Sequence, residues 1–121
     1  MKNIATIFFL LFGIITMNAQ SLEGLWNTGK ENTTVKIKKT GDLFEGLLDS
    51  SDNKEAPIGK LLIKDIKKSD DFYEGKIYVV KKEKWYNAKF EPKNNVLIIT
   101  IYSGWMKKTV EWKKQNKDEH K

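Results

Sequence analysis

The amino-acid sequence predicts an exported all-β protein whose domain is a small antiparallel up-and-down barrel of about eight strands. Three observations support this prediction. The chain opens on an apolar segment that is typical of an export signal. Short runs of apolar and β-branched residues then alternate with Gly, Asn, Asp and Lys clusters, which is the pattern of strands and turns. The 121-residue sequence contains no cysteine, so burial rather than disulfide bonds must hold the domain together.

The opening segment matches a secretory signal peptide. Lys2 precedes an apolar run over residues 4–15, and the small residue Ala19 stands near the end of the segment. The run fits the roughly 7–15 residues of a signal-peptide core and is shorter than the ~18–20 residues that span a bilayer. We therefore expect residues 1–20 to be a helical signal peptide that is removed, which leaves a periplasmic or secreted protein without a transmembrane segment. A retained membrane anchor is the alternative interpretation.

Eight strands are predicted in the rest of the chain. Val35 and Ile37 alternate with lysines, as in a strand with one buried face. Turn residues that tolerate positive φ separate the runs, as at residues 40–42 and 93–95. Pro92 cannot donate a ladder hydrogen bond, so we expect it at a strand end or a sheet edge. The expected strands cover residues 24–28, 34–39, 43–49, 58–66, 72–80, 85–91, 96–102 and 106–113.

These strands form a single domain over residues 21–114. A sandwich and a closed barrel would both bury one face of the sheet, and the barrel is favoured because closure also removes exposed edges. Residues 50–57 form the longest irregular stretch, which is either a solvated connection or a lid. Residues 115–121 are polar and charged, which predicts a disordered tail.

Composition limits the chemistry. The chain has a net charge of +6, and all of its basic residues other than one histidine are lysines. Lysine offers a hydrated point charge rather than a bidentate fork, so the charge indicates solubility and weak attraction to anionic surfaces, not nucleic-acid binding. The single histidine, His120, falls in the predicted tail, and no histidine-based catalytic pair or metal site is expected.

Paired carboxylates leave one route to acid–base hydrolysis. Asp70, Asp71 and Glu74 cluster in sequence, but they occupy a predicted polar turn, where solvated carboxylates are the simpler interpretation. We therefore expect no enzymatic activity, no cofactor and no metal ion.

Several segments together carry a family resemblance. They are Gly24-Leu25-Trp26-Asn27-Thr28, Val35-Lys36-Ile37, Gly75-Lys76-Ile77-Tyr78, Tyr86-Asn87-Ala88-Lys89, Tyr102-Ser103-Gly104 and Thr109-Val110-Glu111-Trp112. In this order and spacing the sequence resembles DUF2147, a family of exported bacterial proteins of unknown function. The resemblance implies a compact calycin-like β-barrel and no established activity. Many members of the family carry a cysteine pair where this chain has Thr40 and Glu45, so a disulfide is not implied here.

The first predicted strand also resembles the start of lipocalin-type barrels. In those barrels a Gly-x-Trp tryptophan closes one end beneath a basic residue from the last strand. Gly24 and Trp26 match this pattern, and the resemblance implies that Lys113 or Lys114 covers the indole. This role is structural.

Aromatic residues supply the functional hypothesis. By strand parity Tyr78, Trp85 and Tyr102 fall opposite the more consistently apolar face, so they either coat the outside of the barrel or line a cavity. The leading hypothesis is a non-catalytic barrel that binds an apolar or amphipathic small molecule, or an envelope component, at a mouth rimmed by these residues and Trp105. Lysines around such a rim favour anionic head groups.

A second hypothesis rests on the strand at residues 96–102, which is apolar on both faces. Val96 and Ile98 are either covered by a neighbouring part of the chain or form a face that meets a partner. The alternative function is therefore a structural or protein-interaction module that docks through the Val96/Ile98 face.

Overall fold

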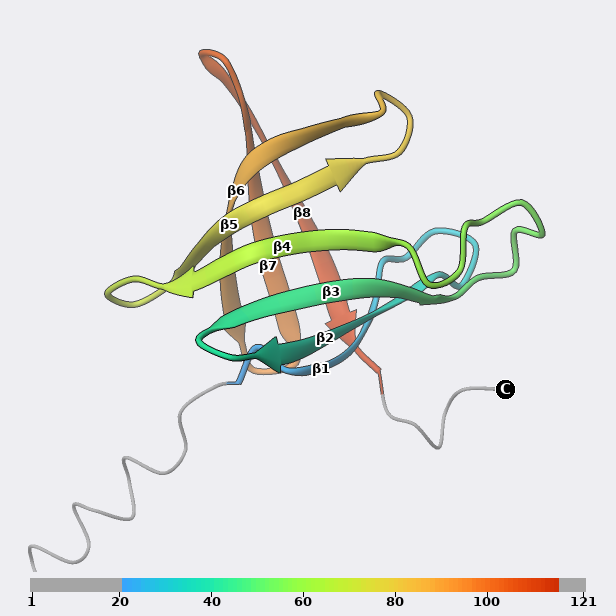
Figure 1. The fold of residues 1–121 in the computed structure, drawn as a ribbon, viewed down its shortest axis with the longest axis horizontal. Coiled ribbons are helices and arrows are strands. Elements are labelled where there is room, and N and C mark those ends of the chain that lie inside the picture. The colour runs from blue at the N-terminus through green and yellow to red at the C-terminus, as the bar shows by residue number, and fades with distance from the viewer. Residues whose placement is uncertain (1–20, 116–121) are drawn as a thin grey trace, which may run out of the picture.

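The computed structural model describes residues 21–115, so the predicted signal peptide and residues 116–121 lie outside the described range. Eight strands follow one another around a closed antiparallel barrel, and β8 returns to pair with β1 (Figure 1). The predicted all-β barrel is thereby confirmed. The strands are β1 (Gly24–Asn27), β2 (Thr34–Thr40), β3 (Leu43–Ser50), β4 (Leu61–Lys68), β5 (Tyr73–Val79), β6 (Lys84–Lys93), β7 (Val96–Ser103) and β8 (Met106–Lys114).

Each strand differs from its predicted range by one or more residues at a boundary, and two of these differences have a clear local cause. β4 begins at Leu61 rather than residue 58, because Ile58 and Lys60 donate to the carbonyls of Ala56 and Pro57 in a turn. β6 runs on through Pro92, which pairs with β7. This proline lies beyond the last β6 residue that pairs with β5, so the strand is locally an edge and the missing N–H is tolerated.

The connections alternate between the two ends of the barrel, because consecutive strands run in opposite directions. The open end carries the connections at residues 28–33, 51–60, 80–83 and 104–105. The closed end carries the turns at residues 41–42, 69–72 and 94–95. In Figure 1 the β2–β3 and β4–β5 turns point to the left, and the β3–β4 and β5–β6 connections lie to the right.

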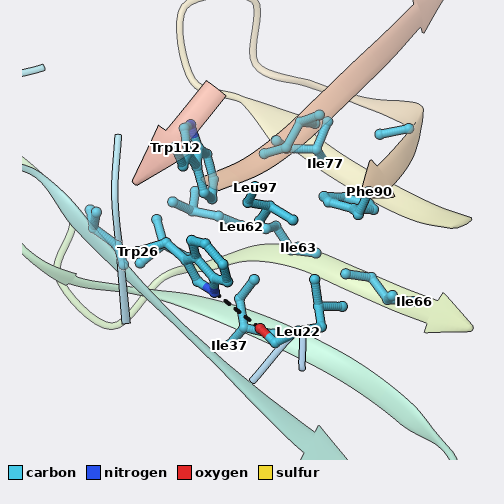
Figure 2. Close-up of a cluster of buried hydrophobic side chains, with 14 residues drawn as sticks. Leu22, Trp26, Ile37, Leu62, Ile63, Ile66, Ile77, Phe90, Leu97 and Trp112 are labelled. Atoms are coloured by element: carbon cyan, nitrogen blue, oxygen red, sulfur yellow. Dashed lines mark hydrogen bonds between the residues drawn. The ribbon is translucent and has the colours of Figure 1, made fainter. Parts of the chain in front are cut away.

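The hydrophobic core fills the closed half of the barrel. Alternation places Val35 and Ile37 of β2 inwards, opposite Trp26 and Gly24 of β1, as the sequence pattern predicts. The most deeply buried apolar side chains are Leu22, Trp26, Val35, Ile37, Ile63, Ile66, Phe90, Leu97 and Ile99. They belong to one buried cluster, and Figure 2 shows the Trp26 indole within it, near Ile37.

Trp26 is held from both sides. Its Nε1–H donates a hydrogen bond to the Leu22 carbonyl at 3.0 Å, drawn as a dashed line in Figure 2. The Lys114 Nζ lies 4.7 Å from the centre of a Trp26 ring and donates to the Glu23 carbonyl at 2.7 Å. A Cβ on Gly24 would clash with the Lys114 ammonium group. Of the two lysines that the sequence left open, Lys114 is therefore the one that covers the indole.

Lys113 has a different environment. It pairs with Asn27 of β1 and Val96 of β7, and it is exposed on the opposite face of β8. Beyond the strand, the Gln115 N–H donates to the Leu25 carbonyl at 2.8 Å, and the Asn27 amide donates to the Gln115 Oε1 at 2.8 Å. The contacts of the barrel thus extend to the first residue of the predicted tail.

Candidate functional site

A cavity of about 440 Å³ opens into the barrel from its open end. Small-molecule sites usually enclose roughly 300–1,000 Å³, and this volume lies within that range. Its walls come from β5 to β8, and its mouth includes the β1–β2 and β5–β6 connections. The lining residues are Thr28, Lys30, Ile77, Tyr78, Val79, Lys82, Tyr86, Ile101, Ser103, Met106, Lys107, Lys108, Val110 and Trp112. The barrel is therefore packed in its closed half, and its open half is hollow on the side of β5 to β8.

The strand register explains which side chains face this cavity. Residues directly opposite each other in an antiparallel pair point to the same face of the sheet. Ile77 is opposite Tyr86, and Ile101 is opposite Lys108. Trp112 lies four residues after Lys108 on the same face of β8 and belongs to the buried core. Figure 2 shows Trp112 and Ile77 on the side of Trp26 away from Leu22.

The charge of the lining is uneven. Lys30, Lys82, Lys107 and Lys108 are among the residues that line the cavity, and no aspartate or glutamate is among the described lining residues. The deeper wall is apolar, with Ile77, Ile101, Val110 and Trp112 among its members. Lysine stems can lie along an apolar wall while their heads remain hydrated. This lining suits a molecule with an apolar body and an anionic end.

Two of the predicted ligand residues lie together on the outer face of the barrel. Tyr78 of β5 is opposite Trp85 of β6, with ring centroids 5.3 Å apart and ring planes at 63°. The Lys60 Nζ lies 4.5 Å from the Tyr78 ring centre, and the Lys64 Nζ lies 4.2 Å from the Trp85 ring centre. Of the two alternatives that strand parity left open, these two side chains therefore coat the outside of the barrel. Tyr78 also borders the cavity.

The other two predicted residues are near the open end but apart from the inner wall. Tyr102 is opposite Asn87 of β6 and lines a separate, open hollow on the outer face. Trp105 lies in the β7–β8 turn and is 93% exposed. A direct contact of any of the four aromatic residues with a ligand stays a prediction.

The inner wall of β8 is the part of the site that the sequence analysis missed. Met106, Lys108, Val110 and Trp112 share the inward face of this strand with Lys114. Every second residue of β8 from Met106 to Trp112 points inwards, and this period of two could be read from the sequence. It was not recognised because lysines surround these residues, and Lys108 itself breaks the alternation of apolar and polar residues.

The carboxylates considered for hydrolysis lie away from the cavity. Asp70 and Asp71 occupy the β4–β5 turn at the closed end, and Glu74 is exposed on β5 opposite Lys67 and Lys89. Within residues 21–115 no group of three or more His, Cys, Asp or Glu side chains is placed to hold a metal ion. The same part of the chain has no helix of the length and apolarity that crossing a membrane requires.

The Val96/Ile98 face is outward and half-buried. Ile98 lies between Glu91 of β6 and Glu111 of β8. Val96 lies similarly between Lys93 and Lys113. Charged neighbours thus flank both apolar side chains, and no large apolar patch forms along this strand.

The comparison with solved structures supports the fold. The structure is similar to that of HP1028 from Helicobacter pylori, a protein described as belonging to the lipocalin family. The two share a TM-score of 0.69 and 22% sequence identity over 82% of this chain and 86% of that chain. No family model and no curated protein sequence matches this chain. The fold is therefore lipocalin-like, and the resemblance to DUF2147 stays a prediction.

Proposed function

We propose that this protein is a non-catalytic carrier or sensor that holds one small amphipathic molecule with an anionic end in the barrel cavity. The observation that carries the proposal is the lining of that cavity. An apolar inner wall meets four lysines at and near the mouth, and the described lining residues include no carboxylate. Apolar burial would supply most of the affinity, since about 25 cal/mol is gained for each Å² of apolar surface removed from water.

The lining of the cavity also predicts the orientation of the bound molecule. The apolar part points toward Trp112 and Ile77, because these side chains belong to the buried cluster that closes the inner part of the barrel. The anionic end stays near Lys108, and Lys30 and Lys82 of the mouth also line this cavity. A carboxylate or phosphate ester on a hydrocarbon chain has this distribution of polarity.

Export belongs to the same proposal. It rests on the apolar opening of the sequence and on the similarity of the barrel to a lipocalin-family structure. The absence of a catalytic role is supported by the distance in the fold between the open-end cavity and the acidic β4–β5 turn at the closed end. Membership of DUF2147, on the motifs given above, is compatible with both points.

Titration with a fluorescent long-chain fatty acid tests the proposed function. We expect saturable binding of one molecule per chain, and displacement by unlabelled fatty acid. The variant Ile101→Trp fills the cavity from β7 and is expected to abolish binding. Its matched control is Ile98→Trp, which makes the same replacement on the same strand but on the outer face, and should bind like the parent protein.

Two results would contradict the proposal. One is the absence of saturable binding for fatty acids, lysophospholipids and other extracted envelope lipids alike. The other is equal loss of binding in both tryptophan variants with the circular dichroism of each unchanged, because the cavity would then not be the site.

A further inference from the structure

The exposed large hydrophobic side chains of the described barrel gather at one end. Among residues 21–115, Trp105 is 93% exposed, and Ile58, Val80 and Met106 are each more than half exposed. Ile58 and Val80 lie in the β3–β4 and β5–β6 connections, and Trp105 and Met106 lie where β7 turns into β8. All of these positions belong to the open end. Single exposed apolar residues are normal on protein surfaces, but such a one-ended distribution needs a reason.

Positive charge accompanies the most exposed part of this set. We define the docking tip as Val80, Trp105 and Met106 with the lysines around them, which are Lys81, Lys82, Lys84, Lys107 and Lys108. Glu83 is the only acidic residue within residues 80–84 and 103–108. The tip therefore carries five lysines against one carboxylate.

The other loops at the two ends of the barrel lack the positive charge of the docking tip. At the open end, the segments at residues 28–33 and 51–60 contain equal numbers of lysines and carboxylates. At the closed end, the β4–β5 turn carries Asp70 and Asp71. The excess of positive charge thus coincides with the exposed indole.

The two connections of the docking tip border one opening. Val79 and Lys82 from the β5–β6 side, and Met106 and Lys107 from the β7–β8 side, line the same cavity. Figure 1 shows the β7–β8 turn and the β5–β6 connection as the parts that project furthest at the top of the barrel. A flat surface that meets the docking tip would therefore cover the mouth of the cavity.

We propose that the docking tip binds the surface of an anionic lipid bilayer. Tryptophan favours the boundary between head groups and hydrocarbon, where its ring is apolar and its N–H remains hydrated. Lysines near an anionic leaflet are attracted to its surface potential. Trp105, Met106 and Val80 enter the interfacial layer, and the five lysines contact head groups. This docking is independent of whether the cavity holds a ligand, and it turns the mouth toward the bilayer.

Vesicle flotation tests the docking. The protein is used without residues 1–20, because all eight strands of the described barrel lie after Ser21 and the apolar opening segment would itself bind lipid. We expect binding to vesicles of phosphatidylglycerol and phosphatidylcholine at low salt, much weaker binding to phosphatidylcholine alone, and release as salt is raised. Tryptophan emission should shift to shorter wavelength on binding, and the shift should disappear in Trp105→Phe. Trp26 and Trp112 are already buried, and Trp85 packs against Tyr78 and Lys64 on the barrel wall.

A pair of double variants separates local from overall charge. Lys107→Glu with Lys108→Glu is expected to lower the partition onto anionic vesicles by about tenfold or more, as expected for lysines at the lipid surface. Lys36→Glu with Lys38→Glu makes the same change in net charge on exposed positions of β2 and should lower it far less. Circular dichroism confirms that both variants are folded.

Three outcomes would overturn the inference. They are absence of binding to anionic vesicles at low salt, an equal loss in the two double variants, and binding with an unshifted Trp105 emission. The last two would assign any affinity to net charge alone, and the first would turn attention to an acidic protein partner. None of them bears on fatty-acid binding in solution, so the proposed function is tested separately.

Discussion

At the scale of single residues, the contrast between two tryptophans shows how the fold sorts identical side chains. Trp26 is 1% exposed, whereas Trp105 is 93% exposed. The buried indole has its N–H paired with the Leu22 carbonyl, which matters because an unpaired buried donor is costly. The Lys114 ammonium group lies over its ring. Trp26 is therefore a core residue that stabilises the closed end, and the exposed Trp105 is available to contact another molecule.

Truncation of the two tryptophans should change the free energy of unfolding by very different amounts. Trp26→Ala is expected to lower the free energy of unfolding by about 3–5 kcal/mol, as large core truncations do. Trp105→Ala should change it by no more than ~0.5 kcal/mol, because the side chain has almost no packing partners to lose. Urea denaturation followed by far-ultraviolet circular dichroism measures both. A small loss for Trp26→Ala would mean that the closed end does not depend on this indole.

Lys114 and Lys113 form a second matched pair. Lys114→Met should destabilise the protein by about 1 kcal/mol, because it removes a hydrogen bond to the Glu23 carbonyl and a cation–π contact with Trp26. Lys113→Met removes the same charge from the outer face of the same strand and should be nearly neutral. Urea midpoints of the two variants give the comparison. Equal effects would indicate a response to net charge rather than to the contact.

At the scale of strands, alternation predicted the elements well where the inner face is uniformly apolar. β2 and β6 follow their sequence pattern closely. β4 departs from it, because its register with β5 shifts between Lys64 and Lys67, where Asp65 has a positive φ of 56°. The inner face of β8 was not predicted, because a simple alternation of apolar and polar residues places a lysine such as Lys108 on the exposed face. Its inward direction follows only from its register opposite Ile101.

The irregular pairing of β4 and β5 depends on Gly75. A Cβ at this position would lie 2.7 Å from Ile66 Cγ1, 2.8 Å from Ile66 Cα and 2.9 Å from the Lys64 carbonyl oxygen. Two of these atoms belong to the backbone, so rotamer changes cannot relieve the clash. Gly75→Ala should therefore destabilise the barrel by about 1–3 kcal/mol. Thermal unfolding measures this, with the exposed neighbour variant Lys76→Ala as control. An unchanged midpoint for Gly75→Ala would show that the two strands can separate without cost.

At the scale of the whole molecule, the sequence predicted the closure of the barrel but not the state of its interior. Closure follows from eight successive strands and from a Gly-x-Trp start that meets the last strand, where Trp26 is opposite Lys114. Whether the interior is filled depends on the total volume of the inward side chains that all the strands contribute at each height along the barrel axis. Large side chains gather toward Trp26 and Phe90, and this leaves a hollow along β5 to β8 in the open half. The aromatic residues predicted for the mouth lie outside this hollow or at its outer edge.

The cavity and the docking tip share Lys108, so its role in ligand binding needs a test in solution, without lipid. Lys108→Met is expected to weaken binding of a long-chain carboxylate by about fivefold, the value of one partly exposed charge interaction. It should leave binding of the alcohol of equal chain length unchanged, because the methionine keeps the apolar stem against Ile101. Competition against a fluorescent fatty acid measures both affinities.

Lys113→Met is the control for this prediction, since it removes the same charge from the outer face of β8. It should affect neither ligand. A similar loss for carboxylate and alcohol in Lys108→Met would mean that this side chain contributes packing rather than charge. A similar loss of carboxylate binding in both variants would assign the preference for anions to the net charge of the molecule, and the polarity of the proposed ligand would no longer follow from the cavity.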